Sequence, residues 1–165
     1  MKTIHPMLWF DDQAEEAAQH YVSILPSSKL GTISRYSAAG PLPEGTVMTA
    51  DFELGGQRFV ALNGGPEFKF NESISFVAPC ESQAEVDEYW DKLVEGGEPS
   101  ACGWLKDRYG LSWQVVPIEL DQMMLDPDPV KAQRVTEAML KVWGKFDIAE
   151  LRAAFEGEPV GSASR

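Results

Sequence analysis

The chain has 165 residues, 44% of them apolar and 10% aromatic, which suits one globular domain or two small fused modules. It carries 14 Lys and Arg against 26 Asp and Glu, and the net charge of −12 with no basic stripe disfavours nucleic acids and anionic membranes as partners. No apolar run approaches the length of a membrane span.

The compartment is predicted from the amino terminus and the cysteines. The opening MKTIHPMLWF has neither the apolar core nor the cleavage site of a signal peptide, so we expect a cytoplasmic protein. The two cysteines, Cys80 and Cys102, are then expected to be free thiols, although the sequence leaves a disulfide open.

The first part of the chain predicts one strand, one helix and three more strands. Alternation favours a strand over Ile4–Phe10, at an edge or seam because Pro6 cannot donate a ladder hydrogen bond. An amphipathic helix follows, capped by Asp11 or Asp12 and stopped by Pro26. The three later strands are Lys29–Ser37, Thr46–Leu54 and Gln57–Asn63.

The same order then begins again. A strand over Ser73–Ala78 precedes a helix that starts at a capping box of Ser82 and Glu85. Two short strands follow within Gly103–Pro117, joined by a tight turn near Arg108–Gly110. Strand, helix and strands therefore occur twice, which indicates an α+β fold built from a structural repeat.

The last part of the chain predicts helices of a different character. Asp128 and Pro129 begin one helix that continues to Gly144, and Asp147 caps a last short helix. Neither helix can bury its apolar face alone, so both are expected to pack on the sheet or on a second subunit. Residues 158–165 are expected to be disordered.

Most motifs that carry chemistry are missing. The sequence has no nucleotide-binding glycine loop, phosphate loop, nucleophile elbow or zinc-binding helical motif. His5 is either a structural residue or a ligand contact, and Gln114 either hydrogen-bonds inside a cavity or closes a gap in the packing. Cys102 lacks an adjacent base in the sequence, so a packing role is favoured over a nucleophilic one.

The aromatic side chains are informative as a set. They fall in predicted strands or in the loop between the two repeats, and some of them must build the core. If several face one concavity, that concavity would suit a small, flat or apolar ligand. The set is Trp9, Phe68, Phe70, Trp104 and Trp113.

Several segments resemble the PhnB-like family of the vicinal oxygen chelate superfamily, which includes glyoxalase I, extradiol dioxygenases and bleomycin-resistance proteins. The resemblance is carried by IHPMLWFDDQAEEAAQHYVS, FVALNGGPEFKFNESISF, CGWLKDRYGLSWQVVP and the tail DPDPVKAQRVTEAMLKVWGKFDIAELRAAFEG. It spans residues 3–157. Members often carry the name 3-demethylubiquinone-9 3-methyltransferase, yet the glycine-rich turn that usually cradles S-adenosylmethionine is missing here.

The resemblance implies a single domain over residues 1–157 with the glyoxalase/bleomycin resistance/dihydroxybiphenyl dioxygenase fold. Two βαβββ modules, at about residues 3–65 and 72–117, would each curl around half of a cleft, and helices would follow over about 118–156. A homodimer is also implied. The four metal-ligand positions of the metal-dependent members fall on His5, Asn63, Ser73 and Gln114.

Only His5 among these four is a strong ligand for a transition metal. Two amides and a hydroxyl supply no negative charge, so we expect no metal or other cofactor. Strand alternation predicts matching faces for all four residues. The expected ligand contacts are His5, Trp9, Asn63, Phe70, Ser73, Cys102, Trp104 and Gln114.

Four functions remain open. The first is a metal-free protein that binds a small molecule, and the second is an enzyme of glyoxalase, lyase or methyltransferase type with His5 as the acid–base group. The third is a metal enzyme that recruits Glu67 or Glu72, and the fourth is a structural dimer with an empty cleft. Binding of a small molecule is preferred.

Overall fold

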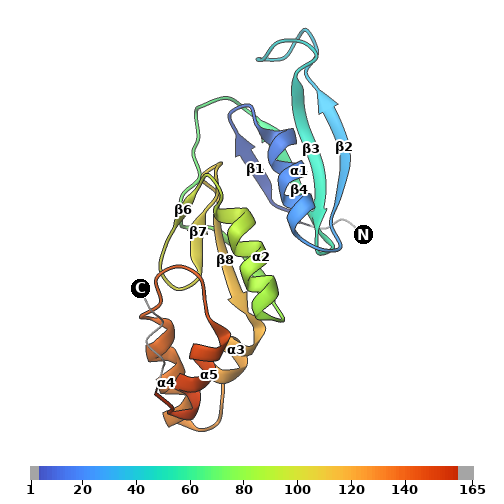
Figure 1. Cartoon of the computed structure of the whole chain (residues 1–165). Helices are drawn as coiled ribbons and strands as arrows, with labels where there is room; N and C mark the ends of the chain where they lie inside the picture. Colours follow the sequence, from blue (N-terminus) through green and yellow to red (C-terminus); the bar gives the residue numbers. More distant parts are fainter. Residues whose placement is uncertain (1–3, 160–165) are drawn as a thin grey trace. The chain divides into compact units, whose positions relative to one another are not determined.

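A computed structural model describes residues 4–159, and the chain divides into two compact units between Asn71 and Glu72 (Figure 1). Residues 160–165, which make up most of the predicted disordered tail, lie outside the described residues. Within the described residues, no helix is both long enough and apolar enough to cross a membrane.

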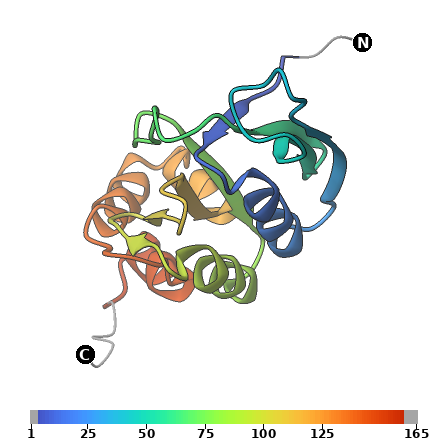
Figure 2. The same cartoon turned by 90° about the horizontal axis from the view of Figure 1, so that it is seen from above.

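The first unit is one four-stranded sheet with one helix. Strand order is β1-β4-β3-β2, with β1 and β4 parallel and the other neighbours antiparallel. The helix lies on one face of the sheet, where it contacts β3 and β4 (Figures 1 and 2). The elements are β1 (Met7–Phe10), α1 (Ala14–Ile24), β2 (Lys29–Arg35), β3 (Val47–Leu54) and β4 (Gln57–Asn63).

The start of this unit corrects two expectations. Strand β1 begins at Met7 rather than Ile4, whose side chain is fully exposed, so Pro6 precedes the strand; the predicted edge position is confirmed. Neither Asp11 nor Asp12 caps α1. Its N-cap is Gln13, which makes no side-chain capping hydrogen bond.

The second unit repeats the same architecture before its C-terminal helices. Its strand order, β5-β8-β7-β6, again places the parallel pair at one edge, which confirms the predicted repeat of βαβββ modules. The elements of this module are β5 (Ser75–Cys80), α2 (Gln83–Val94), β6 (Glu98–Pro99), β7 (Trp104–Lys106) and β8 (Ser112–Pro117).

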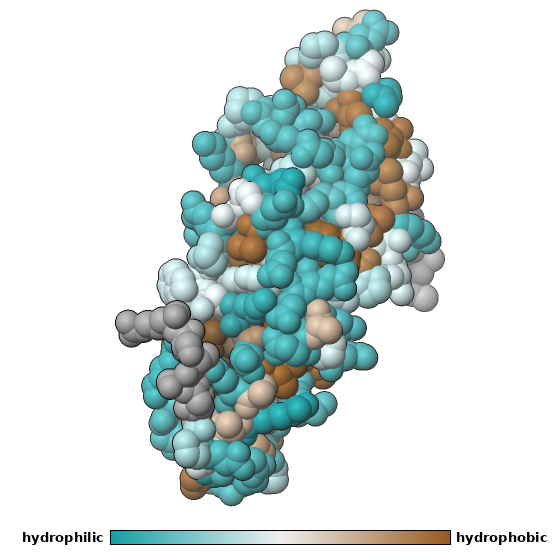
Figure 3. Space-filling model, viewed as in Figure 1, coloured by the Kyte–Doolittle hydropathy of each residue, from teal (hydrophilic) through white to brown (hydrophobic). Residues whose placement is uncertain are grey.

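Helix α2 follows the predicted pattern most closely. The Ser82 hydroxyl accepts a hydrogen bond from the Glu85 amide, and Val86, Trp90 and Leu93 are buried on the side that contacts the sheet. The outward face is charged, and Figure 3 shows hydrophilic side chains over α2. Strand β6 was not predicted, because two residues containing a proline carry no alternating pattern.

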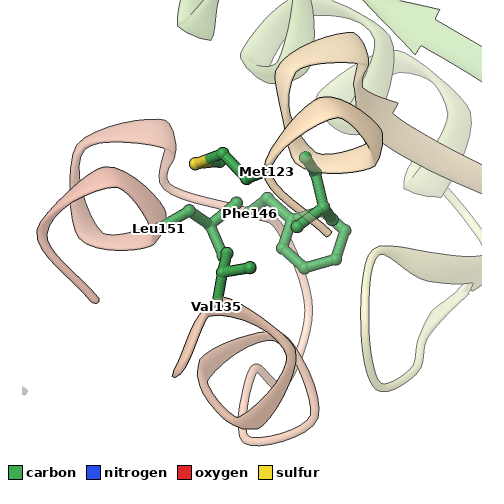
Figure 4. Close-up of a cluster of buried hydrophobic side chains, with 5 residues drawn as sticks. Met123, Val135, Phe146 and Leu151 are labelled. Atoms are coloured by element: carbon green, nitrogen blue, oxygen red, sulfur yellow. The ribbon is translucent and has the colours of Figure 1, made fainter. Parts of the chain in front are cut away.

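Three helices after β8 build a small core of their own. They are α3 (Ile118–Met124), α4 (Pro129–Met139) and α5 (Ile148–Glu156). Met123, Val135, Phe146 and Leu151 converge between them (Figure 4), together with Leu120, and Val116 of β8 packs against this cluster. The predicted helix from Asp128 to Gly144 was too long, because α4 ends at Met139. Helix α3 was not predicted. The apolar faces are covered by one another and by the module.

The side chain of Gln83 in α2 forms two hydrogen bonds to the backbone at the start of α5 and just before it. Its amide nitrogen donates to the Phe146 carbonyl at 3.0 Å, and its amide oxygen accepts from the Ile148 nitrogen at 2.8 Å. We expect Gln83→Ala to lower the free energy of unfolding by about 1–3 kcal/mol, because two partly buried backbone groups lose their partner. Hydrogen exchange should also accelerate at residues 146–148. Gln133→Ala, on the exposed side of α4, is the control and should change neither quantity; equal behaviour of the two variants would contradict this role.

Candidate functional site

Each sheet has one face that its helix does not cover, here called the open face. In the first sheet, Leu8 and Phe10 are buried, and Phe10 pairs with Asn63, whose side chain meets the start of α1, so Trp9 between them lies on the open face, opposite Leu62 of β4. The Trp9 indole nitrogen donates to the Gly65 carbonyl at 2.9 Å, and its ring meets Phe68 edge-on at 5.0 Å. A side chain at Gly64 would overlap the ring, so this glycine permits the close contact.

Asn63 lies on the other face, and the expectation of matching faces is wrong for it. It pairs in register with buried Phe10, and its side chain is 5% exposed. The amide oxygen accepts from the Ala14 nitrogen at 2.7 Å, and the amide nitrogen donates to the Val47 carbonyl at 3.1 Å. Asn63 therefore caps α1 from a neighbouring strand, and Leu62 occupies the open face at this point. A ligand contact of Asn63 stays a prediction.

The other predicted contacts in the first unit are His5 and Phe70. His5 is half-buried and precedes β1, and its acid–base role stays a prediction. The Phe70 ring lies edge-on to Phe10 at 5.2 Å, so it packs against a core residue, while Phe68 is the aromatic partner of Trp9. Sequence spacing did not separate these two phenylalanines, since both belong to a loop without periodicity.

The open face of the second sheet holds a polar group beside an aromatic one. Gln114 of β8 stands in register with Trp104 of β7, and both are half-buried. The Gln114 amide nitrogen donates to the Ser75 hydroxyl at 2.8 Å. Ser73 was the predicted residue here, but it precedes β5 and is exposed, whereas Ser75 lies in the strand. The sequence alone did not give the parallel register of β5 and β8, which decides which serine meets Gln114.

A row of charged side chains, Glu72, Lys106 and Glu98, lies beside Gln114 and Trp104. Lys106 of β7 forms an ion pair with Glu72, and Glu98 of β6 stands opposite Lys106 in register. The hydrogen bond that Lys106 donates to Glu72 raises the pKa of Lys106 and lowers the pKa of Glu72. Both groups are therefore charged at neutral pH. With Glu98 included, the row carries one cation against two anions.

Cys102 packs against the C-terminal helices. It begins the link to the C-terminal helices, with its thiol 3.4 Å from the Met139 carbonyl and its amide nitrogen donating to Val142 at 2.9 Å. The predicted packing role fits these contacts, and its predicted contact with a ligand stays a prediction. Cys80 and Cys102 are both free thiols.

The buried thiol of Cys80 gives a pH-dependent prediction. Burial, with Glu85 as a smaller contribution, raises its pKa from the ordinary 9.0 to about 12. The unfolded chain ionises first, so the stability from this neutral thiol is present below pH 9.0 and is lost as the pH rises towards about 12. We expect iodoacetamide to modify Cys80 at mildly alkaline pH only after denaturation, as mass spectrometry of the digested peptide can report. Modification of the native protein at the denatured rate would contradict this burial.

The residues at the predicted metal-ligand positions do not fit a transition metal. Asn63 uses both amide atoms within the fold, Ser73 is an exposed hydroxyl outside the strand, and Gln114 is a neutral amide. Among residues 4–159, no group of three or more His, Cys, Asp or Glu side chains could hold an ion. A metal site normally contains imidazole, thiolate or carboxylate ligands, and this set contains one imidazole.

Comparison with known proteins places the chain in a family. A family model described as 3-demethylubiquinone-9 3-methyltransferase matches residues 2–116. The chain belongs to this family. The structure of a PhnB protein from Bacillus cereus is 35% identical in sequence, with a TM-score of 0.64, and the match covers 70% of this chain and 99% of that one. No match was found among the curated proteins.

Two further solved structures support the fold alone. Protein PA1353 from Pseudomonas aeruginosa is 23% identical, with a TM-score of 0.58 over 71% of this chain and 98% of its own. The fosfomycin resistance protein FosX from Listeria monocytogenes is 15% identical, with a TM-score of 0.53 over 73% of this chain and 94% of its own. The chain is thus a PhnB-like protein with the vicinal oxygen chelate fold. The family match ends at Val116, just before helices α3–α5.

Proposed function

We propose that this PhnB-like protein binds a small molecule on the open faces of its sheets, without a bound metal. The observation that supports the proposal is the polar pair of Gln114 and Ser75, half-buried beside Trp104. Burying polar atoms costs free energy unless they are hydrogen-bonded, and here the Ser75 hydroxyl accepts from the Gln114 amide nitrogen, which keeps the amide in place beside the Trp104 ring.

The chemistry of this face suits recognition of a ligand. The Gln114 amide supplies both a donor and an acceptor, the Ser75 hydroxyl can do the same, and Trp104 offers a flat apolar surface. A few convergent polar groups among apolar ones are typical of small-molecule sites. His5 and Trp9 remain proposed contacts from the first module.

A ligand panel tests this proposal. Metal-free protein would be screened by thermal shift against small aromatic and hydroxylated compounds, with hits titrated by tryptophan fluorescence. We expect at least one compound to raise the melting temperature saturably, and Gln114→Leu to weaken that shift. Gln57→Leu, on the exposed end of β4, is the control. A panel without any hit, or hits that require added metal, would contradict the proposal.

S-adenosylmethionine belongs in the same panel because the matched family carries a methyltransferase name. We expect no shift from it, since the chain has no glycine-rich turn after a strand at which this cofactor usually binds.

We also propose that the protein is a homodimer. Large apolar side chains stand exposed on the sheets and the loop between the units, among them Met7, Phe68 and Val77 at 58%, 59% and 55% exposure. Light scattering after size exclusion should then give about twice the chain mass of 18.2 kDa. A mass near 18.2 kDa at micromolar concentration would contradict it.

A further inference from the structure

The C-terminal helices of the second unit carry a cavity of about 630 Å³, where α4 and α5 pack together (Figure 1). Its lining residues all fall within Arg134–Glu158, in the two helices, in the segment that joins them and just after α5. Small-molecule sites have volumes of roughly 300–1,000 Å³, so this cavity is large enough for a ligand. It is separate from the open faces of the sheets, and the family match ends before it, at Val116.

The side chain of Trp143 lines this cavity and is 74% exposed. Its backbone is held in place, because Trp143 forms an antiparallel bridge with Ala101. The next residue, Gly144, donates to the Ser100 carbonyl at 2.8 Å and accepts from the Gly103 nitrogen at 3.0 Å. An exposed ring on a fixed backbone offers aromatic surface to a ligand at a small cost in conformational freedom.

The charged side chains around the cavity have one negative charge in excess. Three of them are basic and four are acidic, and they come from both helices and from the residues that join and follow them. The basic ones are Arg134, Lys141 and Lys145, and the acidic ones are Glu137, Asp147, Glu150 and Glu158.

Two of the three basic side chains already have partners in the fold. The Lys145 ammonium pairs with Asp87 and Asp91 of α2, at 2.9 and 3.5 Å. The Arg134 guanidinium lies against Gly157 at the end of α5, where a side chain on that glycine would overlap it. The last carbonyls of a helix carry partial negative charge, so this position suits a guanidinium.

Two of the acidic side chains lack such a partner. Within residues 4–159, Glu150 and Glu158 take part in none of the ion pairs. A carboxylate or phosphate entering the cavity would therefore meet net negative charge. A cation would instead be attracted to the carboxylates and to the face of the Trp143 ring.

We propose that this cavity binds a small organic cation, an ammonium or guanidinium group carried on an apolar body. The cationic group would contact the Trp143 ring and the Glu150 carboxylate, and the apolar body would contact side chains such as Ala138 and Val142. This second site does not depend on the proposed function, because none of its residues belongs to the open faces.

Three compounds with the same apolar ring test the charge of the ligand. Cyclohexylamine, cyclohexanol and cyclohexanecarboxylate are cationic, neutral and anionic at neutral pH, and none of them is aromatic. The five tryptophans would be replaced by 5-fluorotryptophan, and the fluorine resonance that disappears in Trp143→Phe belongs to Trp143.

We expect cyclohexylamine to shift the Trp143 resonance saturably and to bind at least about threefold more tightly than cyclohexanol, with the carboxylate weakest. Binding of cyclohexanol or the carboxylate as tight as that of the amine would overturn the assignment. A Trp143 resonance that does not move with cyclohexylamine would overturn it too.

Two variants test the residues, with affinity measured by ligand-observed nuclear magnetic resonance. Trp143→Leu and Glu150→Gln should each bind cyclohexylamine about threefold to fivefold more weakly than the wild type. Glu81→Gln is the matched control, since it also removes one negative charge but lies outside the cavity lining, and it should bind as the wild type does. Equal affinities of Glu150→Gln and Glu81→Gln would overturn the role of Glu150.

Urea denaturation shows whether Trp143 has a structural role instead. Because its side chain is exposed and the bridge to Ala101 uses backbone atoms, Trp143→Leu should unfold at the wild-type urea concentration. If this substitution converted a dimer into a monomer, the ring would belong to a subunit interface and the inference would fall.

The outcomes separate this site from the open faces. A cyclohexylamine titration that moves the Trp104 resonance and leaves that of Trp143 in place would overturn the inference and leave the proposed function standing. A ligand panel without any hit other than organic cations at Trp143 would contradict the proposed function and support this second site.

Discussion

Replacing Asp107 by alanine should lower the free energy of unfolding by about 3–5 kcal/mol, the largest effect that we expect from one substitution. Asp107 lies in the turn between β7 and β8 and is 3% exposed. One carboxylate oxygen accepts from the backbone nitrogens of Tyr109 and Leu111 at 2.9 and 3.0 Å. The other accepts from the indole nitrogen of buried Trp113 at 2.9 Å. Alanine would leave these donors without their partner inside the protein.

Urea denaturation measures this effect, and two further variants sharpen it. Asp107→Asn keeps an acceptor for the backbone nitrogens but turns an amide N–H₂ towards the Trp113 nitrogen, so an intermediate loss is expected. Asp121→Ala, on the exposed side of α3, should stay within about 0.5 kcal/mol of the wild type. If Asp107→Ala were as stable as Asp121→Ala, the carboxylate could not be the element that organises this turn.

Asn63→Ala should be the second most damaging substitution, with an expected loss of about 2–4 kcal/mol. The variant removes the acceptor for the Ala14 nitrogen at the start of α1 and the donor to the Val47 carbonyl. Both hydrogen bonds lie inside the first module, and the one to Ala14 is buried. Without them, β4 loses its side-chain hydrogen bonds to α1 and to β3.

The control for Asn63 is Gln57→Ala at the exposed start of the same strand, which should cost less than about 0.5 kcal/mol. Asn63→Asp is informative as well, because it keeps an acceptor near the positive end of α1 but cannot donate to Val47. A stable Asn63→Ala variant with weakened ligand binding would instead restore Asn63 to the ligand site, as the sequence resemblance suggested.

The fold could be predicted from local signals because both modules follow them closely. Strand β4 has the predicted bounds, Gln57–Asn63, and the capping residue of α2 was also predicted correctly. These features depend on alternation, glycine turns and capping residues, which act over a few residues of sequence.

The candidate site was harder to predict because it depends on which strand residues are neighbours. Asn63 follows the alternation of β4, but its face is decided by the parallel register with Phe10, which no local pattern contains. The partner of Gln114 is Ser75 rather than Ser73 for the same reason.

Elemental analysis of the purified protein tests the central claim. The claim is that the open faces provide hydrogen-bonding groups and aromatic surface for a ligand, rather than a set of metal ligands. The protein would be incubated with Zn, Ni, Mn and Fe(II), freed of unbound ions, and measured at known chain concentration. We predict retained metal far below one ion per chain, because the four positions supply one imidazole, two amides and a hydroxyl, with no negative charge to offset the desolvation of the cation. Retention near one ion per chain would contradict the claim and direct attention to metal-dependent chemistry.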